Sequence, residues 1–340
     1  MPRSLHTHSK PARVVAIGGG TGLSALLRGL KQCVAPSPFA DSADPIRDLV
    51  AVVTVTDDGG SSGRLRREYG ILPPGDIRNC MVALSQDEAL LSRLFQYRFA
   101  SGNGLKGHSF GNLFLAALSH VTGDFTRAVS VSSEVLAIRG RIFPSTNQLV
   151  SLEAVLENGR HVAGESRISR TATPIRRVRL VPRRAKPLPE VLEALVKADL
   201  ILLGPGSLYT SVIPNLLISG VAEAIRKSRA TKVYVSNLMT QPGETVGYTA
   251  ADHVRAILDH GGPGLIDSVI LNKAPFAPAV ARRYRAQGAY PVSTDVTQLE
   301  RMGLRCIADD LIEQHSKVRH NSRRLARLVL REFILKRSHS

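Results

Sequence analysis

The chain has little of what marks several classes of protein. It contains no tryptophan, 5% aromatic residues and three cysteines among 340 residues. Cys33, Cys80 and Cys306 lack the close spacing of metal-binding or disulfide-rich domains, so we expect buried thiols in a reducing compartment. No apolar run reaches the roughly 18 residues of a membrane-spanning helix, and the polar start lacks the apolar segment of a secretory signal. These absences predict a cytoplasmic protein without a membrane span.

Acidic residues are also scarce. The chain has 28 Asp and Glu against 45 Lys and Arg, which gives a net charge of +17. Such a charge attracts polyanions and phosphorylated small molecules. The basic clusters lack the stacking aromatic residues of single-strand binders and no nucleic-acid motif accompanies them, so we expect no specific nucleic-acid partner. The clusters lie at residues 64–67, 176–186, 282–285 and 317–337.

Strand and helix patterns alternate along the chain. Short apolar runs rich in β-branched residues alternate with helical stripes such as Leu23, Leu26, Leu27 and Leu30. Runs that are apolar on both faces suit parallel strands covered by helices on each side. The sequence therefore predicts an α/β fold with a Rossmann-like, doubly wound, mostly parallel sheet. The predicted strands are residues 14–17, 49–55, 200–203, 232–235 and 268–271.

The middle of the chain, at about residues 145–185, has a different pattern. Between residues 149 and 181 it predicts strands without helices, and Asn158-Gly159 is typical of a two-residue hairpin turn. We therefore predict an inserted antiparallel β subdomain within a single α/β domain of residues 12–337. Residues 1–11 and 338–340 are predicted to be disordered tails.

The first predicted strand ends in Gly18-Gly19-Gly20-Thr21-Gly22, directly before a helical pattern. Glycine admits positive φ and leaves backbone amides open to an anion at the positive end of the helix, so this turn predicts a phosphate cradle. The structural alternative is that the glycines serve only to let the strand-to-helix turn pack closely. The spacing differs from the G-x-G-x-x-G of dinucleotide sites, and no Gly-Lys-Ser/Thr follows as in a P-loop. The hypothesis that the chain is an NAD-linked oxidoreductase is therefore supported only by the strand–glycine–helix pattern near its start.

Acidic residues follow the second predicted strand and lie beside the cradle if the sheet is doubly wound. Carboxylates in a phosphate site either hold Mg²⁺ or form hydrogen bonds in a turn. We consider Asp57, Asp58 and Asp76 as metal ligands. Mg²⁺ is the one cofactor that the sequence suggests. The structural alternative is a turn capped by Ser61 and Ser62, followed by a helix whose N-cap is Asp76.

Further polar loops stand at strand ends and helix starts. His108 has the chemistry to meet a phosphate or transfer a proton, and Asn112 to read a base or sugar. The strand at 200–203 runs into Gly204-Pro205-Gly206-Ser207, a second glycine-rich loop, and the strand at 232–235 runs into a loop that carries Asn237. Open α/β sheets bind ligands at the carboxyl ends of their strands, so we expect these loops to share one site.

Taken together, six segments resemble the bacterial gluconeogenesis-factor family, also called YvcK-like, within the 2-phospho-L-lactate transferase (CofD-like) superfamily. The resemblance spans roughly residues 13–335. It implies a Rossmann-like core, a cytoplasmic location, binding of UDP-sugars such as UDP-N-acetylglucosamine, and self-association as a homodimer. It also implies a role in cell shape and envelope synthesis during growth on gluconeogenic carbon. The segments are residues 16–22, 55–61, 73–78, 107–112, 204–211 and 236–244.

The resemblance also assigns roles to single positions. The two glycine loops correspond to phosphate-contacting segments, the acids match magnesium-binding positions of the transferases, and Arg319 lies in a stretch that resembles the family's C-terminal Arg-His motif. The transferases carry Asn-Thr-Gly-Asp-Asp where this chain has Thr54-Val55-Thr56-Asp57-Asp58. The resemblance therefore carries over the fold and not the deazaflavin chemistry.

Our leading hypothesis is a non-catalytic or regulatory UDP-sugar-binding protein, with no residue assigned a catalytic role. The alternative is a Mg²⁺-dependent, phospho-lactate-type transferase that acts on a nucleotide diphosphate-linked substrate. The predicted ligand contacts are Gly19, Gly20, Thr21, Gly22, Asp57, Asp58, Gly59, Ser61, His108, Asn112, Gly204, Gly206, Ser207, Asn237 and Arg319.

Overall fold

A parallel sheet of seven strands forms the centre of the protein. The computed structural model describes residues 11–35, 44–86, 90–314 and 317–336, so the predicted tails lie outside the described residues except for Pro11. The strand order is β10-β9-β8-β7-β1-β2-β3, and every neighbouring pair is parallel. This confirms the predicted doubly wound sheet. The strands are β1 (Ala12–Gly18), β2 (Ile46–Val53), β3 (Arg141–Pro144), β7 (Leu200–Leu203), β8 (Thr231–Val235), β9 (Ser268–Asn272) and β10 (Arg305–Asp309).

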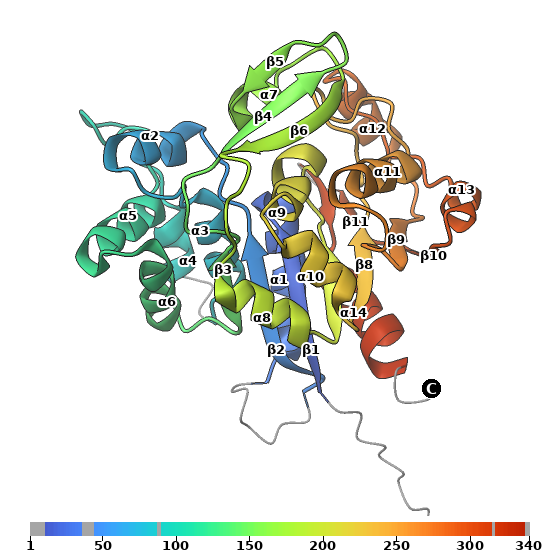
Figure 1. The fold of residues 1–340 in the computed structure, drawn as a ribbon, viewed down its shortest axis with the longest axis horizontal. Coiled ribbons are helices and arrows are strands. Elements are labelled where there is room, and N and C mark those ends of the chain that lie inside the picture. The colour runs from blue at the N-terminus through green and yellow to red at the C-terminus, as the bar shows by residue number, and fades with distance from the viewer. Residues whose placement is uncertain (1–10, 36–43, 87–89, 315–316, 337–340) are drawn as a thin grey trace, which may run out of the picture.

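The sheet is buried because helices cover both of its faces. On one face, α1 (Gly20–Leu30) packs against α3 (Gly75–Leu84) and α14 (Ser322–Val329). On the other, α8 (Pro189–Lys197) packs against α10 (Val221–Lys227), and α9 (Ile213–Leu216) contacts both α10 and α11 (Ala250–Gly261). Figure 1 shows α8 and α10 in front of β1 and β2. The predicted stripe of Leu23, Leu26, Leu27 and Leu30 has no exposed surface, so it is confirmed as core.

Further helices extend the two ends of the sheet. Near β3 lie α2, α4, α5 and α6, and α5 packs on α2, α4 and α6. At the opposite end of the sheet, α12 and α13 lie on the same side of the molecule as β9 and β10 (Figure 1). These helices are α2 (Gly60–Tyr69), α4 (Leu90–Gln96), α5 (Phe110–Thr122), α6 (Phe125–Val135), α12 (Pro278–Arg285) and α13 (Val296–Arg301).

The predicted insertion forms a separate three-stranded antiparallel sheet in the order β5-β4-β6. Its strands are β4 (Ser151–Leu156), β5 (His161–Ala163) and β6 (Ile175–Val181), and the β4–β5 hairpin turns at the predicted Asn158-Gly159. Figure 1 shows this sheet beyond the carboxyl ends of β1 and β2.

The prediction that this region lacks helices is wrong, because it contains α7 (Glu165–Ile168). Asp58, from the loop after β2, accepts a hydrogen bond from the Ser166 backbone N–H (2.9 Å) and so satisfies an amide of the first turn. The cap comes from a residue more than a hundred positions earlier, so the local sequence carries no signal for it.

A second small hairpin, β11 (Ile312–Gln314) and β12 (Val318–His320), leads into α14. Asn321 caps that helix, since its Oδ1 accepts from the Arg324 N–H (3.0 Å). Within the described residues, no single helix has the length and apolar character to cross a membrane. The segments Leu208–Leu216 and Val221–Lys227 have this length and apolar character only when they are taken together, and they are bent by 74° relative to each other.

Candidate functional site

A cavity of about 390 Å³ lies at the carboxyl ends of β1, β7 and β8. The loops after these strands form most of its wall, and β12 together with the end of α12 closes one side. The structure thus brings together loops that are about 200 residues apart in the sequence. The predicted ligand contacts that line this cavity are Gly19, Gly20, Thr21, Gly22, Gly206, Ser207, Asn237 and Arg319.

The two glycine loops touch each other at backbone distance. A Cβ atom on Gly22 would lie 2.5 Å from the Pro205 carbonyl oxygen, and a Cβ on Gly206 would lie 3.3 Å from that of Gly19. Asn215, which is fully buried, donates from Nδ2 to the Gly18 carbonyl (3.3 Å) and so ties the first loop to α9. The two loops form one continuous backbone surface on which a side chain at Gly22 would not fit and one at Gly206 would be tight.

The first glycine loop places the start of α1 at the cavity. The helix begins at Gly20, whose φ of +63° favours glycine, and its N-cap Gly19 supplies no side-chain cap. The first amides of α1 therefore carry the positive end of the helix dipole toward the cavity. This is the arrangement predicted for a phosphate cradle.

Polar side chains from other elements complete the wall. Gln241 donates from Nε2 to Ser207 Oγ (2.8 Å), and its Oε1 is buried without a hydrogen-bond partner among the residues described. Arg319 lines the cavity with an exposed side chain that makes no ion pair within the described chain. The neighbouring His320 is buried, and desolvation lowers its pKa to about 4, so it is neutral near pH 7.

Carboxylates gather behind the cradle. The Asp76 carboxylate accepts a hydrogen bond from the Gly20 N–H, and its Oδ2 would lie 2.5 Å from a Cβ on Gly19. Desolvation and the nearby charge of Asp57 raise the pKa of Asp76 to about 6. Glu165 of α7 accepts from Thr56 Oγ1 (3.0 Å), and desolvation together with both aspartates raises its pKa well above the ordinary range.

The predicted metal ligands do not converge. Asp57 and Asp76 lie close enough to influence each other, but Asp58 turns toward the insertion and accepts from Ser166 Oγ (2.7 Å). No group of three or more His, Cys, Asp or Glu side chains in the described ranges is placed to hold a metal ion. Two carboxylates fit only an ion held chiefly by the phosphates of a ligand. The Mg²⁺ prediction stays a prediction.

Two structural alternatives from the sequence are wrong. Ser61 and Ser62 do not cap the acidic turn, because both lie inside α2, whose N-cap is Gly59. The turn is closed instead by Asp57 Oδ1, which accepts the Gly59 N–H (2.9 Å). Asp76 is not an N-cap, because α3 begins at Gly75. Its side chain serves the start of α1 rather than that of its own helix.

The remaining predicted contacts lie away from the cavity. Ser61 Oγ pairs with His108 Nδ1 (2.9 Å) in the interior, where desolvation lowers the pKa of His108. Asn112 Oδ1 accepts from the Arg78 guanidinium (3.1 Å). Gly204, with a φ of +74°, precedes the lining residue Pro205 but does not itself line the cavity. Ligand contact by these residues stays a prediction.

Several residues of the site were not singled out from the sequence. Gln241 and Glu244 stand in the loop after β8, and the position of that loop after a strand is the signal that points to them. Glu244 is 5% exposed and accepts from Thr210 Oγ1 (3.1 Å) and the Tyr209 N–H (3.2 Å), so it ties the loop after β8 to the loop after β7. Tyr284 and Glu165 come from segments without a motif.

Comparisons with known proteins agree with this architecture. The sequence pattern of the 2-phospho-L-lactate transferase CofD family matches residues 14–312, and the chain belongs to that family. It is 49% identical over 322 residues to the gluconeogenesis factor of Halalkalibacterium halodurans, covering 94% of this chain and 96% of that protein. It is 48% identical over 319 residues to the gluconeogenesis factor of Bacillus subtilis, covering 94% and 97%.

A solved structure shows the same fold. A crystal structure of a protein from Bacillus halodurans superposes with a TM-score of 0.89 at 49% identity and covers 94% of this chain and 100% of that one. Within the CofD family, the chain therefore groups with the gluconeogenesis factors, as its motifs predicted.

Proposed function

We propose that the protein binds a UDP-sugar of the UDP-N-acetylglucosamine type in the cavity and acts as a binding or regulatory protein. The observation that carries the proposal is the pair of glycine loops in backbone contact on one cavity wall, with the start of α1 between them. A diphosphate matches this surface because it spreads negative charge over several acceptors, which two sets of backbone amides can share.

Other groups in the cavity suit the remaining parts of such a ligand. Arg319 supplies a cation at the rim, where it can close over the diphosphate. The buried, unpaired Oε1 of Gln241 suits a donor on the ligand, such as the N–H of a uracil ring or a sugar amide. Cytoplasmic location, a homodimer, and a role in cell shape and envelope synthesis on gluconeogenic carbon belong to the same proposal, on the family resemblance.

Calorimetry with UDP-N-acetylglucosamine tests the proposal. Gly22→Ala places a Cβ 2.5 Å from the Pro205 carbonyl, so the loops must separate, and we expect at least a tenfold loss of affinity. Gly18→Ala, at the end of β1 directly before the loop, is the matched control, because its Cβ would make only ordinary contacts, the nearest at 3.6 Å. No saturable heat at millimolar ligand with the wild-type protein would contradict the proposal.

The second candidate is a Mg²⁺-dependent transferase of nucleotide diphosphate-linked substrates. It is favoured by the position of Asp57 and Asp76 directly behind the cradle, where they could hold an ion bridged by the ligand's phosphates. The ion would neutralise charge on the leaving diphosphate. Titrations with and without EDTA separate the two candidates. We expect UDP-N-acetylglucosamine to bind equally well in EDTA, whereas the transferase candidate requires that EDTA weakens binding.

A further inference from the structure

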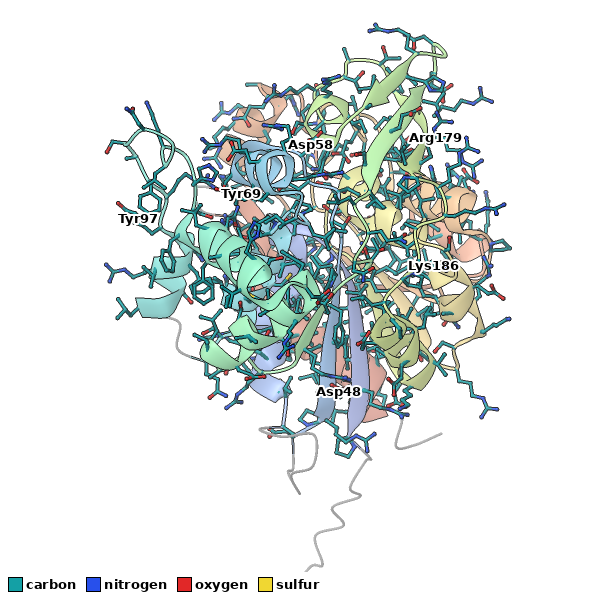
Figure 2. The ribbon with its side chains drawn as sticks, turned by 60° about the vertical axis from the view of Figure 1, so that its left-hand side comes forward. Asp48, Asp58, Tyr69, Tyr97, Arg179 and Lys186 are labelled. Carbon is teal, nitrogen blue, oxygen red and sulfur yellow. The ribbon has the colours of Figure 1, made fainter. Side chains whose placement is uncertain are left out.

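A furrow beside β6 lies outside the site described above. It has a volume of about 420 Å³ and is lined by Arg177, Arg179 and Arg183 together with apolar residues that include Val155 and Leu217. Its lining residues and those of the glycine-loop cavity do not overlap. Figure 2 shows Arg179 on the insertion and Lys186 on the same flank of the molecule. The furrow is thus a concave surface that brings three arginines together with apolar residues.

The strand geometry sets these arginines side by side. Residues two apart on a strand face the same way, so Arg177 and Arg179 project together from β6, roughly 7 Å apart. Their partners across the strand pair are Val155 and Glu153. The backbone of β6 is fixed from its other edge, because the Val178 N–H donates to His260 Nε2 of α11 (3.0 Å). The arginines therefore stand on a rigid support.

The charges in the furrow are only partly balanced. Arg179 pairs with Glu153, and the Glu153 carboxylate is shared with His161 (2.6 Å). Arg177 and Arg183 have no ion pair or side-chain hydrogen bond within the described chain. The stretch from residue 176 to residue 186 contains six basic residues and no acidic one. Like charges held together in a concavity repel one another, and an anion between them relieves that repulsion.

We propose that this furrow is a second anion-binding site, which takes small multivalent anions of the phosphate type. Arginine suits such a ligand because its planar fork donates two parallel hydrogen bonds to phosphate oxygens. Arg177 and Arg183 supply the uncompensated charge, and Arg179 supplies further donors while its pair with Glu153 holds it in place.

A tryptophan reporter tests the proposal in the full chain. The protein has no tryptophan, and Val181, at the end of β6, is 47% exposed and lies outside the furrow lining. In the Val181→Trp protein, titration with inorganic pyrophosphate should give a saturable fluorescence change. A local reporter separates this binding from any pyrophosphate that enters the glycine-loop cavity.

Charge variants in the same background decide the result. Arg177→Gln with Arg183→Gln should weaken the fluorescence titration at least tenfold and flatten its dependence on salt. Arg160→Gln with Arg170→Gln is the matched control, because it removes two exposed arginines of the same subdomain that do not line the furrow. We expect this control to titrate as the parent does. Equal weakening in both double variants, or no saturable change in the parent, would overturn the proposal.

Discussion

Asp76 is a buried carboxylate beside the cradle, where both the folded protein and an anionic ligand favour its neutral form. Its pKa of about 6, against an ordinary value of 3.8, corresponds to about 3 kcal/mol between the two protonation states. A raised pKa means that its contribution to stability is fully present below pH 4 and is lost as the pH rises through 6. The ionised group should therefore destabilise the unliganded protein near pH 7.

We expect Asp76→Asn to remove this loss while keeping an oxygen that accepts the Gly20 N–H. Urea unfolding at pH 4.5 and at pH 7.5 should show that the stability of the variant relative to the wild type rises by about 2 kcal/mol between the two pH values. Part of the pH dependence should remain, because Glu165 also has a raised pKa. Asp124→Asn, at the exposed N-cap of α6, is the control carboxylate outside the cluster.

The same variant bears on function. Removing a negative charge beside the cradle should strengthen metal-free binding of UDP-N-acetylglucosamine at pH 7.5, whereas a transferase that needs Mg²⁺ on Asp76 would lose affinity. A stability difference that does not change between the two pH values, or that falls as the pH rises, would refute the reasoning about this carboxylate.

Three further predictions follow from single contacts. Asp58→Ala should speed amide hydrogen exchange across β4 and β6 more than across β1, because Asp58 caps α7 and so joins the insertion to the loop after β2. Asn321→Ala should cost about 1 kcal/mol in urea unfolding through loss of the α14 cap. Buried His320 has its pKa lowered to about 4, so its contribution to stability is present above pH 6.5 and is lost toward pH 4. His320→Gln should therefore flatten the fall in the urea-unfolding free energy between pH 6.5 and pH 4, and an unchanged fall would contradict this assignment.

The central strands of the fold were predictable from the sequence because they are buried on both faces. Continuous apolar runs at β1, β2, β7, β8 and β9 left no other reasonable assignment. The strands β3 and β10, at the two ends of the sheet, were missed. Each has polar or exposed positions, such as Arg141 and Arg305, which interrupt the apolar run because an end strand has a neighbour on one side only.

The site was predictable where its residues follow strand ends and carry motifs. The two glycine loops, Asn237 and Arg319 line one cavity as expected. The carboxylate cluster was only partly predictable, because Glu165 meets Thr56 across a separation of 109 residues and no local pattern records that contact. Ser61 and His108 show the opposite case, in which polar residues of a motif satisfy each other inside the protein.

The most direct test of the account is a crystal structure of the protein with UDP-N-acetylglucosamine and Mg²⁺. The account predicts the diphosphate within hydrogen-bonding distance of the backbone amides at residues 21–22 and 206–208, with the Arg319 side chain turned toward it. A diphosphate held by a metal ion on Asp57 and Asp76, away from these amides, would contradict it.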